Sequence, residues 1–529
     1  MSGGNTYLVA QQQAASRCDP FNQRMTMTFK TMFGACMLLG MAAHAQLPVK
    51  QLSQATPFAN TITPDFLEQR LRVLASAEME GRETGTPGQE KAAIYIESQF
   101  QGFGLKPGAA GQWRQYYPMF IDTLGSHTAL EVNGTHIPYG DDFKANIMSS
   151  HGDTLENVPV VFVGRGIADK DRDDYAGLDV KGKVVLFLSE DKYPADSAYT
   201  GAARGLSDAA KRFWASNKGA KAVLVLDDNP RKPDFPRAGF MRMQRNPGGR
   251  MANEYLVRSG VAALISGVDS ASLKTLKPGT LANPVSILYE KVPVELKPSN
   301  VLAFLEGTDK KDEVLFITGH YDHLGKKDGK IYYGADDDGS GTTAVLALAH
   351  AFAEAKKAGK GPRRSIVFMT VSGEEKGLLG SNYYVEHPLY PLEKTVADLN
   401  TDMVGRIDPG HEQDTNYIYL IGDNKLSSAM RPISEAANNE FTKMKLDYTY
   451  NDPKDVNRFY YRSDHYNFAQ HGIPIIFYFN GVHEDYHKPT DTVDKIHFGL
   501  MARRVQLVFY TAWDIANRDE KLPVDRHEQ

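Results

Sequence analysis

Three polar clusters, each beside a segment of regular structure, constrain this chain most. They read GHYDHLG at Gly319–Gly325, GADDDGSG at Gly334–Gly341 and SGEEKGLLG at Ser372–Gly380. The first cluster follows an apolar run at Val314–Thr318 and the third follows another at Ser365–Val371. Both runs are typical of buried β-strands. Between them, Thr342–Ala355 has the Ala- and Leu-rich pattern of a helix, so this region predicts an α/β sheet.

The charged residues of these clusters are expected to meet at one edge of that sheet. His320 and Asp322 leave the carboxyl end of one predicted strand, and Glu374 and Glu375 leave the end of the next. In an open α/β sheet, sites form at this edge. A histidine and several carboxylates that converge there indicate a divalent metal site, with nitrogen and oxygen ligands that suit zinc.

Composition limits how such a metal is held. The chain has 529 residues, enough for two or three domains with sizeable cores. Its net charge of −5 gives no reason to expect nucleic-acid binding. The only cysteines are Cys18 and Cys36, so neither a disulfide framework nor a cysteine-based zinc site is available. Any metal must therefore be bound by His, Asp and Glu.

The amino-terminal segment resembles an export signal. Phe33–Ala43 is an apolar run that is too short to span a bilayer, and Arg24 and Lys30 precede it as a basic region. The small residues Ala43 and Ala45 predict cleavage near Ala45. We therefore expect an exported chain, periplasmic or extracellular. No later stretch predicts a transmembrane segment.

The sequence before Asn300 predicts two helices followed by a region of short strands and turns. Thr63 and Pro64 begin one predicted helix, and a second covers about Gln89–Phe100. Short strands and turns dominate from Pro118 to Tyr289, and the phrase at Tyr175–Val185 (YAGLDVKGKVV) resembles the protease-associated (PA) domain, a β-rich insertion in peptidases.

After Asn300 the α/β pattern resumes. Strands are predicted at Val301–Leu305, Lys394–Asn400 and Ile473–Phe479, and a helix at Gly499–Ala516. We expect Val301–Leu305 to lie next to Val314–Thr318 in the sheet. The predicted domains are a signal segment (1–45), the first part of a main domain (46–117), a β-rich insertion (118–295) and the second part with the metal site (296–529). A basic loop between Arg231 and Arg250 is interpreted as solvated.

The ligand types needed for a pair of metal ions occur in order along the chain. Two zinc ions that share a hydroxide need a bridging carboxylate, about two further ligands each, and a separate carboxylate as base. The candidates are His320, Asp337, Glu375, Asp402 and His487, with Glu374 beside Glu375. With these residues the chain resembles the co-catalytic di-zinc aminopeptidase family, which includes secreted bacterial leucyl aminopeptidases and, more distantly, glutamate carboxypeptidase. That resemblance implies a phosphorylase/hydrolase-like α/β fold, with a mixed, mostly parallel sheet between helices.

The resemblance also implies roles for individual residues. His320 and Asp402 would bind one zinc ion, Glu375 and His487 the other, and Asp337 would bridge them. In the family the peptide bond after the bridging residue is cis, so we expect a cis bond between Asp337 and Asp338.

Four further residues have roles in the reaction by the same resemblance. Glu374 would be the general base and Asp322 would orient His320. Tyr486 would donate a hydrogen bond to the developing oxyanion, and Asp491 would orient His487. The implied function is an exported di-zinc metallopeptidase that removes amino-terminal residues from peptides through a metal-bridged hydroxide.

Several alternatives stay open from the sequence. A carboxypeptidase of the glutamate carboxypeptidase type would share the metals, and a basic pocket would favour it over an acidic one. A glutaminyl cyclase or a non-catalytic binding protein is disfavoured because the whole ligand set is present. Three other histidines, His323, His465 and His483, have no firm role, and Arg462–His465 (RSDH) either lines the substrate pocket or is structural. The oligomeric state is not predicted.

Overall fold

The computed structural model describes residues 52–148, 152–170, 172–189, 207–229, 235, 238–244 and 251–527. The predicted signal segment, both cysteines and most of the basic loop at 231–250 lie outside the described residues. Within the described ranges, no helix has the length and apolar character needed to cross a membrane.

The main sheet has nine strands and carries the sequence-predicted strands at its centre. Its spatial order is β1 (Lys106–Pro107), β15 (Ser299–Leu305), β19 (Arg364–Val371), β16 (Lys310–His320), β20 (Thr395–Thr401), β23 (Ile475–Phe479), β21 (Tyr417–Ile421) and β22 (Lys445–Asp447), with β2 (Arg114–Tyr116) also paired to β15. The central strands β19, β16, β20 and β23 are parallel, whereas β15 and β21 pair in the antiparallel sense. The predicted mixed α/β sheet is confirmed.

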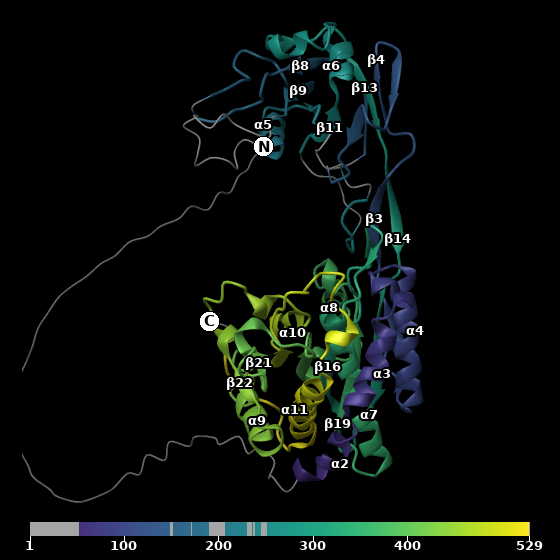
Figure 1. Cartoon of the computed structure of the whole chain (residues 1–529), viewed down its shortest axis with the longest axis vertical. Helices are drawn as coiled ribbons and strands as arrows, with labels where there is room; N and C mark the ends of the chain where they lie inside the picture. The colour runs from purple at the N-terminus through teal and green to yellow at the C-terminus, as the bar shows by residue number, and fades with distance from the viewer. Residues whose placement is uncertain are drawn as a thin grey trace, which may run out of the picture. The chain divides into compact units, whose positions relative to one another are not determined.

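Helices cover both faces of this sheet because its central strands are apolar on both sides. In β16, Leu315 and Ile317 belong to one core, and Val314 and Phe316 belong to the other. The first core is completed by α2 (Thr56–Ala59), α3 (Pro64–Leu74), α4 (Pro87–Gly102), α7 (Gly341–Lys357), α9 (Met430–Ala437) and α11 (Phe498–Asn517), and the second by α8 (Leu379–Glu386) and α10 (His465–Gln470). Figure 1 shows α3, α4 and α7 running alongside β16 and β19.

The predicted start of α3 is confirmed in detail. Pro64 is its first residue, and the Thr63 hydroxyl accepts a hydrogen bond from the Phe66 amide at 3.1 Å. This side chain satisfies one of the amides that a helix start leaves free.

The predicted pairing of Val301–Leu305 with Val314–Thr318 is wrong, because β19 lies between the two strands. The link from β15 to β16 passes over the start of β19, where the Thr308 amide donates to the Arg363 carbonyl at 2.9 Å. At Gly307 a Cβ atom would come within 2.3 Å of that same carbonyl oxygen, so only glycine permits this crossing.

The segment between β3 (Met119–Leu124) and β14 (Lys291–Leu296) forms two further sheets. One contains β12 (Gly279–Thr280), β8 (Val160–Phe162), β9 (Val184–Leu188), β10 (Ala222–Leu226), β11 (Asn253–Val257) and β6 (Phe143–Ala145); the other contains β5 (Thr135–Pro138), β4 (Ala129–Val132), β13 (Val285–Tyr289) and β7 (Asp153–Val158). Helices α5 (Asp208–Asn217) and α6 (Ser259–Ser266), which the sequence analysis did not predict, belong to the same segment. Its apolar clusters contain no residue of the main sheet. The domain boundaries and the PA resemblance stay predictions.

The buried side chain of Arg82 ties the first part of the chain to the loop that follows β16. Its guanidinium donates to the carbonyl oxygens of Tyr321 (2.8 Å), Leu74 (2.7 Å), Tyr333 (2.8 Å) and Gly334 (2.8 Å). Only the planar fork of arginine has the geometry to satisfy four such acceptors at once.

Replacing Arg82 is therefore expected to destabilise the fold strongly. Arg82→Met would remove four hydrogen bonds to buried carbonyl oxygens and a positive charge from an acidic region, which should lower the free energy of unfolding by about 3–5 kcal/mol. Urea unfolding measures this change. Arg72→Met is the matched control: Arg72 is exposed and pairs only with Glu68 one helical turn away, so its loss should change stability by about 0.5 kcal/mol or less. If both substitutions lowered the free energy of unfolding equally, the stabilising role of the four Arg82 hydrogen bonds would be contradicted.

Candidate metal centre

The predicted ligands converge at the carboxyl ends of the four parallel strands. His320 is the last residue of β16, and Asp402 directly follows β20. The remaining candidates follow β19, follow β23 or precede α7, and they are Glu374, Glu375, His487 and Asp337. This arrangement confirms the expectation that these side chains lie at one edge of the sheet.

The segment that carries Asp337 is held by its neighbour Asp338. The Asp337–Asp338 peptide bond is cis, as expected. The Asp338 carboxylate accepts hydrogen bonds from the backbone amides of His320 (3.1 Å), Gly341 (2.8 Å) and Met403 (3.0 Å). It therefore joins the end of β16, the start of α7 and the residue that follows Asp402.

Asp337 lies between two groups of ligand atoms. Its Oδ1 is 3.3 Å from His320 Nε2, which is 3.6 Å from Asp402 Oδ2. Its Oδ2 is 3.1 Å from His487 Nε2, which is 3.2 Å from Glu375 Oε2. Ligand atoms that share a tetrahedral zinc ion at 2.0–2.2 Å are about 3.3 Å apart. The distances therefore match two ion positions with Asp337 between them.

Distance alone also groups Asp338 with His320 and Asp402. The two oxygens of Asp338, however, already accept three backbone hydrogen bonds. Those of Asp337 face only histidines, so Asp337 is the better candidate for the shared ligand.

The unsatisfied atoms of the site fit a bound cation. His320 Nε2, Asp337 Oδ2 and Glu375 Oε1 are buried and have no hydrogen-bond partner. Buried polar atoms are almost always satisfied, and unpaired ones point to an ion or a water molecule. Because these are imidazole nitrogens and carboxylate oxygens, the donor set suits zinc.

The electrostatics also favour positive charge here. Burial lowers the pKa of His320, but nearby carboxylates, Glu374 foremost, outweigh burial and raise it well above its ordinary value. Burial likewise opposes protonation of His487, yet hydrogen bonding to Asp337 and Glu375 raises its pKa to about 10. The carboxylates around both imidazoles therefore favour positive charge at these positions.

Glu374 and Asp322 lie next to each other and close to the proposed ligand His320. Glu374 Oε2 is 3.9 Å from His320 Nε2, and burial raises the pKa of Glu374 well above its ordinary value. Asp322 accepts hydrogen bonds from the Glu374 amide (3.2 Å) and the Thr84 hydroxyl (2.6 Å). The closest contact of His320 Nδ1 is the Asp322 backbone oxygen at 3.1 Å, with the carboxylate at 3.7 Å. Asp322 thus touches both the predicted base and a predicted ligand.

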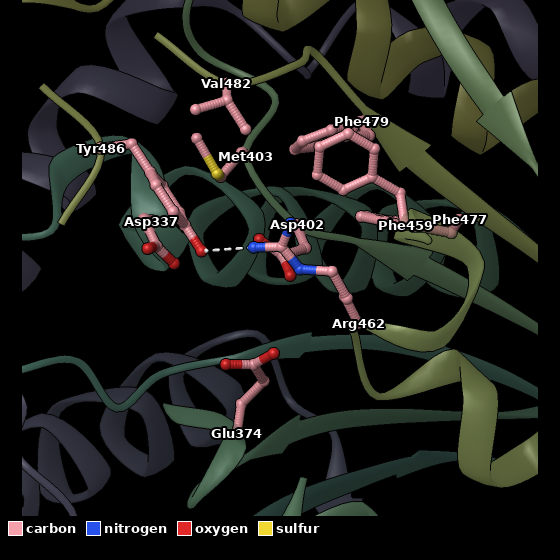
Figure 2. Close-up of a pocket in the computed structure, with 10 residues that line it drawn as sticks. All are labelled: Asp337, Glu374, Asp402, Met403, Phe459, Arg462, Phe477, Phe479, Val482 and Tyr486. Carbon is pink, nitrogen blue, oxygen red and sulfur yellow. Dashed lines mark hydrogen bonds between the residues drawn. The ribbon is translucent and has the colours of Figure 1, made fainter. Parts of the chain in front are cut away.

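Tyr486 lines a pocket beside these residues. Its ring stacks on His487 with centroids 3.9 Å apart, and Arg462 donates to its hydroxyl at 3.2 Å. Figure 2 shows this bond and shows Glu374 facing Asp337 and Asp402 across the pocket.

The predicted contact of Asp491 with His487 is wrong. The Asp491 carboxylate instead accepts hydrogen bonds from the backbone amides of Asp336 (3.0 Å) and Asp337 (3.2 Å). Two backbone amides that point the same way bind a carboxylate well, so Asp491 holds the segment that presents Asp337. His483 also belongs to this support, since its Nε2 is 3.2 Å from Asp336 Oδ2.

The RSDH segment divides between the pocket and the core. Arg462 lines the pocket, whereas His465 is buried, stacks on Phe477 and lies 2.8 Å from the Tyr460 carbonyl. Burial lowers the pKa of His465 to about 3, so this histidine is a neutral core residue.

His323 is the site residue that the sequence analysis left unassigned. It is fully buried, and its Nδ1 is 2.8 Å from Glu375 Oε1. The available signal was the second histidine of GHYDHLG, which follows the ligand by three residues.

A buried chain of hydrogen bonds runs from Asp402 into the sheet. The Ser463 hydroxyl donates to Asp402 at 2.7 Å, and Asn400 donates to Ser463 at 2.9 Å. The Thr318 hydroxyl is 2.9 Å from the Asn400 side-chain oxygen and 2.8 Å from Asp398 Oδ1. Because one hydroxyl has one proton, Thr318 donates to Asn400 only if Asp398 is protonated and donates to Thr318. Burial raises the pKa of Asp398 well above its ordinary value, in agreement with this assignment.

Asp398→Asn is expected to change how stability depends on pH. A carboxyl that keeps its proton in the folded state but loses it near pH 4 when unfolded makes stability fall as pH rises, by about 1.4 kcal/mol per pH unit. Asparagine removes this titration and keeps a donor for Thr318. The free energy of unfolding of Asp398→Asn, relative to that of the wild type, should therefore increase above pH 4. Urea unfolding at pH 5 and pH 7, with a chelator present, measures the difference.

Asp398→Leu serves as the control for that prediction. It removes the titration and the donor together. Its stability should therefore depend on pH as that of Asp398→Asn does, but should be lower at each pH. A difference between Asp398→Asn and the wild type that does not change with pH would mean that Asp398 is ionised in the folded protein.

Comparisons with known proteins place this geometry in a family. Residues 300–512 match the model of "Peptidase family M28". The chain is 30% identical over 260 residues to a probable leucine aminopeptidase of Trichophyton verrucosum. The alignment covers 47% of this chain and 67% of that protein. The chain belongs to peptidase family M28. An M28 relative from Arthroderma otae, also named a probable leucine aminopeptidase, is 31% identical over 235 residues.

The extent of these matches differs between sequence and fold. The alignment to the Arthroderma otae protein covers 43% of this chain and 60% of the relative, so the chain spans less than two thirds of that protein. The solved structure of an aminopeptidase from Aneurinibacillus sp. strain AM-1 aligns over 90% of this chain and all of its own, with a TM-score of 0.51 and 21% identity. At that identity the likeness concerns the fold alone.

Proposed function

We propose that this M28 chain is an exported, zinc-dependent aminopeptidase that uses two zinc ions. His320, Asp337 and Asp402 would hold one ion, and Asp337, Glu375 and His487 the other, in keeping with the distances between their ligand atoms. When bound, the ions supply Lewis acidity for the peptide carbonyl and lower the pKa of water.

The observation that carries the aminopeptidase proposal is the composition of the pocket. It combines three carboxylates with five apolar side chains, and the lining residues are Asp337, Glu374, Asp402, Met403, Phe459, Arg462, Phe477, Phe479, Val482 and Tyr486. Asp337 and Asp402 are metal ligands in this proposal, so Glu374 is the carboxylate left to face the amino group of a peptide, and the apolar wall suits an apolar first side chain. A peptide amino terminus therefore matches this pocket better than a carboxyl terminus.

The residues of this chain have distinct tasks in the proposed reaction. Glu374 accepts the proton of the attacking water at its carboxylate and returns it to the leaving amine, a task that the raised pKa of this buried group favours. Tyr486 donates a hydrogen bond from its hydroxyl to the oxyanion. Arg462 donates a hydrogen bond to the Tyr486 hydroxyl oxygen and so polarises that hydroxyl. Asp322 fixes the backbone of Glu374 through its amide.

Arg462 supports one second candidate. It is the only cation among the residues that line the pocket, and its guanidinium could bind a substrate carboxylate. A carboxypeptidase would use it in that way. Arg462 already donates to the Tyr486 hydroxyl, and the two relatives named above are probable leucine aminopeptidases, so we favour the amine.

Mass spectrometry of a short peptide distinguishes the two orientations. We expect stepwise loss from the amino end of a peptide with an apolar first residue, no loss from its N-acetylated counterpart, and no loss from either after chelation until Zn²⁺ is restored. Acetylation removes the free amino group that an aminopeptidase must bind. Shortening from the carboxyl end would reverse the orientation, and an unchanged peptide would exclude peptidase activity on it.

Glu374→Gln should separate catalysis from metal binding. The amide cannot accept the proton, so kcat should fall by about 10²–10⁴-fold while the metal content stays at the wild-type value. Turnover assays and elemental analysis measure the two properties. Glu386→Gln is the matched control, because Glu386 is exposed at the end of α8. If Glu374→Gln lost its metal together with its activity, Glu374 would be a ligand rather than the base.

A further inference from the structure

His323 is buried in the site without any task in the reaction proposed above. It has no solvent exposure, and its backbone amide donates to the Arg82 carbonyl at 3.2 Å. Neither of its ring nitrogens has a hydrogen-bond partner. A neutral imidazole offers one donor and one acceptor, and burying both unpaired is unfavourable, so something must satisfy this ring.

The ring of His323 faces two of the proposed ligands. Its Nδ1 is 2.8 Å from Glu375 Oε1 and 3.9 Å from Asp337 Oδ2. The first distance would suit a hydrogen bond, yet neither Nδ1 nor Oε1 makes one of acceptable geometry. A cation bound to both atoms is an interaction that would bring them this close.

A shared metal ion accounts for this proximity. At a metal–ligand distance of 2.0–2.2 Å, two ligand atoms are about 2.9 Å apart when they subtend 90° and about 3.3 Å apart in a tetrahedron. The distance of 2.8 Å from His323 to Glu375 matches the first value, and those of 3.2 Å and 3.1 Å from His487 Nε2 to Glu375 and Asp337 match the second. The two imidazoles approach from different directions, with their rings inclined at 68°.

We propose that Nδ1 of His323 is a further ligand of the second metal ion, together with Asp337, Glu375 and His487. This proposal rests on the proposed function, which assigns two ions to the site. Glu375 then faces His323 with one oxygen and His487 with the other. The second ion has four protein side chains against three for the first, so it should be the more tightly bound of the two.

Metal binding by purified holoprotein and its variants tests this proposal. We would measure Zn²⁺ affinity by competition with a chromophoric chelator, and the visible spectrum of the Co²⁺-loaded protein. His323→Ala should weaken one of two Zn²⁺ sites by about 100-fold or more, beyond the 10–100-fold typical of a residue that only contacts a ligand. It should also change the Co²⁺ absorption, because the coordination of that ion changes. His387→Ala is the matched control, because His387 is exposed and stacks on Tyr383.

The outcomes separate this inference from the proposed function. Two Zn²⁺ ions with unaltered affinities and an unaltered Co²⁺ spectrum in His323→Ala would overturn the ligand role while leaving the aminopeptidase intact. A loss of less than about 100-fold, with the Co²⁺ spectrum unchanged, would also overturn it, because an effect of that size is expected when His323 acts only through Glu375. A wild type that binds no metal would overturn the proposed function first.

A second measurement does not depend on the folding of a variant. X-ray absorption by the Zn²⁺-loaded wild type counts the imidazoles around the two ions. Three imidazoles for two ions would support the proposal, since His320, His487 and His323 would each contribute one. Two imidazoles would overturn it.

Discussion

The burial of many carboxylates in one place is the constraint on which the rest of this structure depends. Like charges repel strongly where water is excluded, so each buried carboxylate needs a compensating group. Asp338 and Asp491 are compensated by backbone amides. Asp464 is compensated in part by a proton, since burial raises its pKa to about 7. Arg82 supplies positive charge nearby. The amides that compensate Asp338 come from three separate segments, at His320, Gly341 and Met403.

What the sequence predicted well depends on neighbours along the chain. The strand before His320 and the helix after Asp338 each lie within a short stretch, where apolar patterning decides the structure. What it missed depends on distant segments. The role of Asp491 follows from amides about 155 residues earlier in the chain. The position of β19 between β15 and β16 follows from a crossing at Gly307 that no local pattern records.

The long segment between β3 and β14 interrupts the main sheet without disturbing the site. The chain leaves at β2, whose Tyr116 lies opposite Ser299 of β15. It continues into β3, whose Met119 lies opposite Leu296 of β14. The segment therefore leaves and returns through antiparallel partners, an arrangement in which a fold tolerates an insertion. Thr84, which precedes this segment, donates a hydrogen bond to Asp322, which follows it.

Three of the proposed ligands are held by different parts of the fold, and this makes the site preorganised. Ser463 and the buried chain behind it hold Asp402, the amides that Asp491 accepts fix the backbone of Asp337, and stacking on Tyr486 orients His487. Ligands fixed in this way lose little freedom when a cation binds, so the cost of assembling the site is met during folding.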